Sequence, residues 1–421
     1  MTDTVRHCEN LIADMTTKAR SAASILARAT DDQKSLALKY AAQAVRNDMA
    51  GILAANALDM EASVKAGLSD ALLDRLKLDE KRITAMADAM DKVSTLADPV
   101  GEIIDTHTQP NALVMQRVRI PVGVLGIIYE SRPNVTADAA SLALRSGNAV
   151  ILRGGSEAVH SNRAIHHAMV TGISQAGLPP ESVQSVPTQD RMAVGAMLRA
   201  QGAIDMIIPR GGKSLVARVQ DEARVPVLAH LHGLCHTYVH NLADPEMAKA
   251  IIVNAKMRRT GICGATETLL IDQDYAAPAD LVAALIDAGC EVRADDMVME
   301  LDSRTVSANE EDWDTEYLDS VISVRMVAGL DDAMDHIARH GSHHTDAIIT
   351  QDDAAAARFL TEVDSAIVMH NASTQYADGG EFGLGAEIGI ATGRLHARGP
   401  VALEGLTTYK WLVRGQGQTR P

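Results

Sequence analysis

The sequence predicts an α/β protein with two lobes, each built from strands that alternate with helices. Apolar runs such as 122–129 alternate with segments of helical period such as 135–146, which is the pattern of a doubly wound sheet. The same rhythm restarts after about Leu231 and indicates a second lobe. The chain has 421 residues, which is longer than a chain that folds around a single hydrophobic core usually is.

The first 95 or so residues are expected to form successive helices. Ala22, Ile25 and Leu26 recur at helical spacing, and Thr30 is a suitable cap between two helices. A polar stretch at 105–111 then leads into residues 113–119, where side-chain character alternates. Alternation of this kind predicts an exposed strand or a hairpin arm.

Strands of the first lobe are expected at 122–129, 149–152, 183–186 and 204–208, with helices at 135–146, 157–175, 193–200 and after Ser214. Two of the turns have the form strand, Arg-Gly-Gly, helix, at 153–156 and 210–214. Backbone N–H groups at such helix starts can bind phosphate. Either turn alone is compatible with an ordinary tight turn, but two in one sheet predict a nucleotide or cofactor crevice.

The second lobe contains the candidate nucleophile, Cys263. Its strands are expected at 237–239, 268–271, 321–327 and 347–349, and its helices near 244–256, 278–289, 331–340 and 352–362. Cys263 precedes strand 268–271 and has Gly261 and Gly264 nearby, which keep bulk away from the sulfur. Arg258 and Arg259 could favour the thiolate form. The alternative is a buried structural thiol.

Composition excludes several other classes of protein. The chain carries 39 basic against 55 acidic residues, a formal charge of −16, which disfavours binding to nucleic acid or anionic membranes. An anionic substrate would need a local cluster of arginines. The four cysteines show no C-x-x-C spacing, and we expect neither a disulfide framework nor a metal site. No signal peptide or apolar span is recognisable, so a cytoplasmic location is expected.

Several motifs then point to one family, in the expected order along nearly the whole chain. They are Y-E-S-R-P-N-V-T at 129–136, S-G-N-A-V-I-L-R-G-G-S-E at 146–157, I-I-P-R-G-G at 207–212, the cysteine block at 254–270, G-G-E-F-G-L-G-A-E-I-G-I at 379–390, L-H-A-R-G-P at 395–400 and L-T-T-Y-K at 406–410. The chain closely resembles the γ-glutamyl phosphate reductases, also called glutamate-5-semialdehyde dehydrogenases. A more distant similarity extends to the aldehyde dehydrogenase superfamily.

The resemblance implies an aldehyde-dehydrogenase-like fold in three parts. They are a Rossmann-type cofactor lobe (1–105 and 120–232), a catalytic lobe (233–385), and an oligomerisation arm with a C-terminal segment (106–119 and 386–421). It further implies a homodimer or homotetramer, and allows a transient contact with glutamate 5-kinase.

The implied activity is the NADPH-dependent reduction of L-glutamyl 5-phosphate to L-glutamate 5-semialdehyde and phosphate, in proline biosynthesis, through a thioester on Cys263. The alternatives are an aldehyde-oxidising dehydrogenase, an acyl-CoA reductase, and a catalytically silent scaffold. Hydrolytic relatives carry a general-base glutamate about where residues 230–233 stand, and no carboxylate occurs there. Its absence fits an enzyme that protects a thioester from water.

Two groups are candidates for stabilising the oxyanion, the Cys263 N–H and the side chain of Asn134. The resemblance suggests Asn134 because the superfamily places a catalytic asparagine after this strand. The alternative role of Asn134 is capping of helix 135–146. For Glu267, four residues after Cys263, structural hydrogen bonding is the expected role.

The resemblance assigns seven residues to NADPH. They are Arg153, Ser156 and Glu157 at the adenosine ribose, Gly211, Gly212 and Ser214 near the pyrophosphate, and Glu316 at the nicotinamide ribose. Arg153 or Arg210 could also meet a 2′-phosphate. The alternatives are solvated surface arginines and, for Glu316, an exposed carboxylate at a strand edge.

Arg132, Arg259 and Arg398 are the candidate binders of the anionic groups of the substrate. They lie in three family-matching segments far apart in sequence. Each could instead pair with one of the many acidic residues. His343, His344 and His396 also lie in matching segments, and a structural donor role is expected for each.

Overall fold

The computed structural model describes residues 3–420, with the side chain of Ala71 left out. Residues 1, 2 and 421, which end two of the ranges expected above, lie outside this description. The chain divides into two compact units. Unit 1 comprises Met1–Ala229, Leu384–Gly389 and Val401–Pro421, and unit 2 comprises His230–Gly383 and Ile390–Pro400. Residues 390–400 group with unit 2, and the division into a cofactor lobe, a catalytic lobe and an arm stays a prediction from the resemblance.

Unit 1 is centred on a parallel sheet whose strands run in the order β5-β4-β3-β6. The central strand β3 is buried along its whole length, as its continuous apolar run predicted. All four predicted strands are found, with ends shifted by one or two residues. They are β3 (Val124–Tyr129), β4 (Ala149–Gly154), β5 (Val183–Ser185) and β6 (Met206–Arg210).

The helices of unit 1 confirm the predicted succession over the first 95 residues. The cap at Thr30 is a complete capping box, in which Thr30 and Gln33 each bond the other's backbone N–H. The helices are α1 (Asp3–Leu26), α2 (Asp31–Asn47), α3 (Met49–Lys65), α4 (Asp70–Leu76), α5 (Glu80–Ser94), α6 (Val135–Arg145), α7 (Val159–Gln175), α8 (Arg191–Leu198) and α9 (Lys213–Glu222), with short 3₁₀ turns at Ser156–Ala158, Pro180–Ser182 and Glu404–Leu406.

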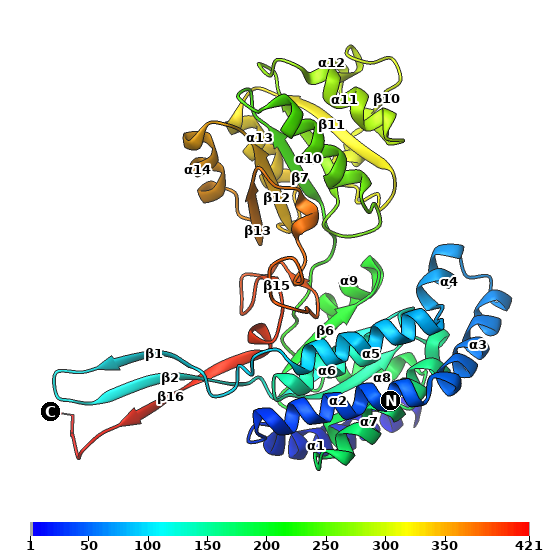
Figure 1. Cartoon of the computed structure of the whole chain (residues 1–421), viewed down its shortest axis with the longest axis vertical. Coiled ribbons are helices and arrows are strands. Elements are labelled where there is room, and N and C mark those ends of the chain that lie inside the picture. Colours follow the sequence, from blue (N-terminus) through cyan, green and yellow to red (C-terminus); the bar gives the residue numbers. More distant parts are fainter. Residues whose placement is uncertain (1–2, 421) are drawn as a thin grey trace. The chain divides into compact units, whose positions relative to one another are not determined.

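The predicted arm is an antiparallel sheet of the order β1-β2-β16. Strand β2 (Val114–Pro121) pairs with β1 (Ile103–Thr108) on one side and with β16 (Thr407–Arg414) on the other. Figure 1 shows these strands projecting as a ribbon from the helices of the same unit. The sequence predicted β2 but not β16, because β16 is exposed along nearly its whole length and carries no buried stripe.

Unit 2 holds a longer parallel sheet in the order β10-β9-β11-β8-β7-β12-β13. The strands predicted at 237–239, 268–271, 321–327 and 347–349 are all present, and β9, β10 and β13 were not predicted. The strands are β7 (Cys235–Val239), β8 (Thr266–Asp272), β9 (Glu291–Ala294), β10 (Val306–Ser307), β11 (Val321–Val327), β12 (Thr345–Ile349) and β13 (Ile367–His370), with a separate β14–β15 ladder (Ile390–Ala391 and Gly399–Pro400).

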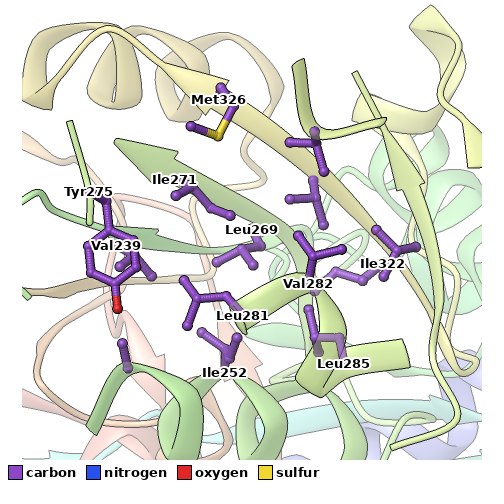
Figure 2. Packing of buried hydrophobic residues seen from close by; sticks show 14 of the residues in the cluster. Val239, Ile252, Leu269, Ile271, Tyr275, Leu281, Val282, Leu285, Ile322 and Met326 are labelled. Carbon is purple, nitrogen blue, oxygen red and sulfur yellow. The ribbon is translucent and has the colours of Figure 1, made fainter. Parts of the chain in front are cut away.

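Helices pack on this sheet over an aliphatic core, as the low aromatic content indicated. Figure 2 shows side chains of β8, such as Leu269 and Ile271, packed against Leu281 and Leu285 of helix α11. The helices are α10 (Pro245–Met257), α11 (Pro278–Asp287), α12 (Asp296–Met299), α13 (Leu330–His340) and α14 (Asp353–Glu362), with 3₁₀ turns at Glu310–Asp314 and Thr374–Tyr376. Among the described residues, no helix is both long and apolar enough to cross a membrane.

Candidate active site

Cys263 lies in the turn between α10 and β8 of unit 2. All four cysteines fall within residues 3–420, and Cys263 alone is half-buried while Cys8, Cys235 and Cys290 are buried. One side of Cys263 packs against the apolar cluster that contains Ile390. The structural-thiol alternative therefore applies to the other three cysteines, and Cys263 keeps the accessibility that a nucleophile needs.

Gly233, just before β7, and Cys235, the first residue of β7, hold the backbone of Cys263. The Cys235 thiol donates to the Cys263 carbonyl oxygen at 3.1 Å, and burial raises the pKa of Cys235 well above its usual value, which keeps the donor proton in place. Gly233 approaches so closely that an added Cβ would lie 2.1 Å from the same oxygen. At Gly264 a Cβ would meet the Thr374 carbonyl oxygen at 3.1 Å, so this glycine serves backbone packing.

A buried ion pair brackets the Cys263 turn. Lys256 Nζ, at the end of α10, lies 2.5 Å from Glu267 Oε2 on β8, and Glu267 Oε1 accepts from the Leu318 N–H at 3.3 Å. Burial raises the pKa of Glu267 to about 7, although Lys256 opposes the rise. These contacts confirm the expected structural role of Glu267.

Two histidines accompany Cys263. Ligand atoms of His230, Cys263 and His344 all lie within 4.8 Å of one another. Burial lowers the pKa of His344 to about 3, with His230 adding to the effect, so His344 is neutral at ordinary pH. The other predicted histidines, His343 and His396, are exposed, and His343 Nδ1 bonds the Asp364 carbonyl oxygen at 2.6 Å.

Glu316 is tied to the same part of unit 2. Its Oε1 accepts from the Gly233 N–H at 2.9 Å, and its side chain is half-buried in a loop segment outside the strands. The alternative of an exposed strand-edge carboxylate is therefore wrong. Gly233 thus contacts both the Cys263 backbone and Glu316.

The first Arg-Gly-Gly turn of unit 1 follows β4. Arg153 is buried, so the alternative of a solvated surface arginine is wrong for this residue. It donates to the Gly154 and Gln189 carbonyl oxygens, and its Nε has no hydrogen-bond partner. Glu157 is half-buried and Ser156 is exposed.

Glu157 holds the loop that precedes α6. Its Oε1 accepts from the backbone N–H of Ser131 at 2.5 Å and from the Ser131 hydroxyl at 2.9 Å. Ser131 has a φ of 48°, a left-handed conformation that needs support from its surroundings in a residue other than glycine. Arg132 and Asn134 follow directly, so Glu157 positions them.

The second turn, after β6, presents the N-terminus of α9. Gly211, Gly212 and Ser214 are exposed there, and the Gly212 N–H donates to Glu130 Oε2 at 3.2 Å. A Cβ at Gly211 would lie 2.5 Å from the same oxygen. The helix start thus contacts an anionic oxygen, which is the contact a phosphate would make.

A cavity of about 270 Å³ opens in unit 1 beside this turn. Arg132 and Asn134 line it together, as do residues from α5, α6, the end of β6 and the C-terminal signature. The lining residues are Ala89, Met90, Val93, Arg132, Asn134, Val135, Asp138, Ala139, Ser141, Leu142, Arg210, Ala386, Glu387 and Ile388. Arginine and carboxylate side chains therefore line one cavity, together with apolar side chains.

Asn134 begins α6 but does not cap it. Its Nδ2 instead donates to Asp138 Oδ2 at 2.8 Å, so the capping alternative is wrong. Burial raises the pKa of Asp138 to about 6, against the lowering effect of the Asn134 bond and of Arg210. The hydroxyl of Ser141, one turn further along α6, is buried without a hydrogen-bond partner.

The other two predicted arginines lie in unit 2. Arg259 is exposed, and its carbonyl oxygen accepts from Gln375 Nε2 at 3.2 Å. Arg398 donates to the Thr392 and Asp364 carbonyl oxygens and pairs with the Asp364 carboxylate at 2.8 Å. Arg398 is therefore engaged within its own unit by the kind of ion pair given as its alternative role.

Sequence reasoning missed Asp138 and Glu387 in the cavity and His230 beside Cys263. Asp138 had a signal, because it is a carboxylate on an otherwise apolar helix, four residues after Asn134. Glu387 lies inside the C-terminal signature. His230 had none, because its proximity to Cys263 depends on how β7 and β8 pair.

Comparison with known proteins identifies the family. The model of the aldehyde dehydrogenase family matches residues 4–305. The chain is 66% identical to the gamma-glutamyl phosphate reductase of Novosphingobium aromaticivorans over 98% of this chain and 97% of that protein. It is 68% identical to that of Sphingopyxis alaskensis over 98% and 96% of the two chains.

Solved structures agree. The crystal structure of gamma-glutamyl phosphate reductase from Thermotoga maritima matches with a TM-score of 0.95 and 42% identity, over 97% of this chain and all of that one. An acetylating aldehyde dehydrogenase from Geobacillus thermoglucosidasius, 16% identical with a TM-score of 0.71 over the full length of both chains, shares the fold. The predicted aldehyde-dehydrogenase-like fold is thereby confirmed. The chain belongs to the aldehyde dehydrogenase family and, within it, to the gamma-glutamyl phosphate reductases.

Proposed function

We propose that this protein reduces L-glutamyl 5-phosphate to L-glutamate 5-semialdehyde and phosphate with NADPH, as a step of proline biosynthesis. The observation that carries the proposal is Cys263, an accessible cysteine whose backbone is held from two sides, in a chain of this family. Names of relatives more than 60% identical along the whole chain supply the substrate.

The proposed chemistry begins at the Cys263 sulfur. The thiolate attacks the acyl phosphate carbon, the C–O bond to phosphate breaks, and phosphate leaves with the electron pair, which gives a thioester. Oxyanion stabilisation is assigned to the Cys263 N–H and the Asn134 amide. The nicotinamide cofactor, when bound, supplies the hydride that reduces the thioester.

Two carboxylates lie close to Cys263 along the chain or contact a residue that touches it, and both already have partners. Glu267 is buried and pairs with Lys256, and Glu316 accepts from the Gly233 N–H. A thioester intermediate survives best where no carboxylate activates water. This supports a phosphorylating reductase over a hydrolytic aldehyde dehydrogenase.

The residues of unit 1 fit a dinucleotide. Arg153 keeps a buried Nε without a partner, and the start of α9 already contacts a carboxylate oxygen through Gly212. A phosphate could take the place of that carboxylate. The proposed contacts of unit 1 to NADPH are those of Arg153, Ser156, Glu157, Gly211, Gly212 and Ser214, with Arg153 or Arg210 as the partner of a 2′-phosphate. Glu316 of unit 2 is the proposed contact to the nicotinamide ribose.

The cavity of unit 1 is the proposed site for the amino acid head of the substrate. That head carries an ammonium and a carboxylate, and the cavity offers Asp138 and Glu387 for the first and Arg132 for the second. Arg259, which is exposed, remains a proposed contact for the phosphate. Arg398 was proposed with them, but its engagement with Asp364 favours a structural role.

A homo-oligomer built on the arm is also proposed. Tyr409, Trp411 and Val413 of β16 leave about half of their surfaces exposed, and a second copy of the chain could cover this apolar stripe. Sedimentation velocity would show a dimer or tetramer that dissociates in Trp411→Glu. The contact with glutamate 5-kinase stays a prediction from the resemblance, and the cytoplasmic location stays a prediction from the sequence.

The reverse reaction tests the function without the labile acyl phosphate. Purified protein with glutamate 5-semialdehyde and NADP⁺ should form NADPH only when phosphate is added. Cys263→Ala should abolish the reaction, and Cys290→Ala, at a buried cysteine of the same unit, should retain it. Turnover with coenzyme A in place of phosphate would instead establish an acyl-CoA reductase. No turnover in folded protein that binds NADP⁺ would favour the silent scaffold.

A further inference from the structure

Three side chains that offer metal ligands converge in unit 2. His230 precedes β7, Cys263 precedes β8 and His344 precedes β12, and their ligand atoms lie within 4.8 Å of one another. Strands β8, β7 and β12 are neighbours in the sheet, so the three residues meet because their strands begin at the same edge. Sequence spacing could not reveal this group, and the absence of a metal motif had led to the expectation of no metal site.

The His230 imidazole is arranged as a metal-bound histidine usually is. His230 Nδ1 lies 2.6 Å from the Ile390 carbonyl oxygen, and a carbonyl can only accept, so Nδ1 carries the proton and Nε2 has the lone pair. Donation of the second ring N–H to a backbone carbonyl is typical of metal-bound histidine. The rings of His230 and His344 meet edge to face with centroids 5.0 Å apart.

His344 gives the independent sign of a ligand. Its side chain is completely buried, its Nδ1 lies 2.9 Å from the Thr345 hydroxyl, and its Nε2 has no hydrogen-bond partner. A buried polar atom left unpaired is unfavourable and calls for an explanation. A cation bound at Nε2 supplies one.

The donor set selects the metal. One thiolate and two imidazoles suit Zn²⁺, whereas Mg²⁺ and Ca²⁺ prefer oxygen ligands. Bonds of about 2.0–2.1 Å to nitrogen and about 2.3 Å to sulfur would place the ligand atoms about 3.3–3.6 Å apart in a tetrahedral site. The group must therefore contract by about an ångström from the 4.8 Å limit when the metal binds.

We propose that His230 Nε2, Cys263 Sγ and His344 Nε2 form a reversible site for Zn²⁺ that masks the nucleophile of this protein. Binding exchanges the thiol proton of Cys263 for the metal and leaves one coordination position for water. Zinc at this position blocks attack on an acyl group, so the metal inhibits and does not catalyse. The inhibition rests on the proposed function, but the binding does not.

Metal binding is measured on the full chain, freed of metal and kept reduced. Zn²⁺ is titrated in competition with a chromophoric chelator, and Co²⁺ absorption reports a thiolate-bound tetrahedral site. One equivalent per chain is expected. Cys263→Ser and His230→Gln should each weaken binding by at least about tenfold, because even changes outside the ligand shell cost about 10- to 100-fold.

His343→Gln is the matched control, since His343 precedes His344 but is exposed and bonds Asp364. It should bind Zn²⁺ like wild type. His344→Gln should lose the site, and if it does not fold, His230→Gln and Cys263→Ser decide the matter. Unchanged affinity in Cys263→Ser, or a Co²⁺ spectrum without thiolate charge transfer, would overturn the site.

Activity is measured separately on wild type. Zn²⁺ should inhibit with the affinity found by titration, a chelator should restore the rate, and glutamate 5-semialdehyde should protect. If Zn²⁺ binds at the three residues but the protein has no phosphate-dependent activity, the proposed function is refuted and the metal site stands. Activity that is indifferent to bound Zn²⁺ would overturn the masking of Cys263.

Discussion

Lys256 and Glu267 form an ion pair of 2.5 Å with both side chains almost completely buried. The pair joins the end of α10 to β8. It thereby links the two ends of the segment that carries Cys263. Lys256 Nζ also lies 5.8 Å from the centre of the Tyr317 ring. A buried charge is tolerated here because each partner neutralises the other.

Removing one partner should therefore destabilise the fold more than removing both. Lys256→Met leaves Glu267 buried without its cation and should cost about 3–5 kcal/mol of unfolding free energy. The double variant Lys256→Met with Glu267→Gln should recover a large part of that loss. Urea unfolding of wild type, both single variants and the double variant measures the coupling, and equal losses in the single and double variants would rule it out.

Gly233 and Gly261, which both lie near Cys263, should differ sharply in how well they tolerate substitution by alanine. A Cβ at Gly233 would lie 2.1 Å from the Cys263 carbonyl oxygen, whereas at Gly261 the nearest atom is 3.8 Å away. Gly233→Ala must displace the cysteine turn, and a displacement of an ångström can cost about 10²-fold in rate. Gly261→Ala is the matched control and should stay near wild type. Steady-state kinetics would contradict this account if Gly233→Ala were fully active.

The local parts of this site could be predicted from sequence, and the parts that depend on tertiary contact could not. Cys263 in its turn and Glu267 as a structural residue follow from neighbours within a few positions. The approach of His230 to Cys263 depends on strand order, and the cavity joins α6 to Glu387, about 250 positions further along the chain. No local pattern encodes such meetings.

The strands show the same limit. Strand β11 was predicted with its observed ends because its apolar run is buried. Strand β16 was missed because most of its residues are exposed, and it is held mainly by its pairing with β2. Glu157 was expected to contact ribose from the motif, yet its carboxylate holds Ser131 in this structure.

Substrate affinity should depend on the charge of Asp138. Its pKa is raised to about 6, so the carboxylate that would bind the substrate ammonium forms as pH rises through about 6. The KM for glutamate 5-semialdehyde should fall across that range and level off above it. Asp138→Asn should raise KM at neutral pH and remove this pH dependence, with Asp280→Asn, on the surface of unit 2, as control. A KM profile that Asp138→Asn leaves unaltered would refute the role.

Stability should respond to pH through His336. Burial lowers its pKa to about 2, helped by neighbouring His236, His340 and Arg325, and Arg325 Nη1 donates to its Nδ1 at 2.8 Å. The unfolded imidazole takes up a proton below about pH 6.5 while the folded one stays neutral. The unfolding free energy should thus be fully present above about 6.5 and fall by up to about 1.4 kcal/mol per pH unit below it.

Urea unfolding between pH 4 and pH 7 measures that slope. His336→Leu should reduce it by about one proton's contribution, whereas His343→Gln, at an exposed position, should leave it as in wild type. An identical slope in His336→Leu would show that His336 does not carry the effect.

In the proposed reaction, Cys263 carries the acyl group until phosphate removes it. Rapid mixing of the protein with glutamate 5-semialdehyde and NADP⁺, without phosphate, tests this directly. We predict a burst of one NADPH per chain followed by arrest, an acyl adduct on the peptide that contains Cys263, and steady turnover on addition of phosphate. Continued turnover without phosphate, or a burst that persists in Cys263→Ala, would contradict the account.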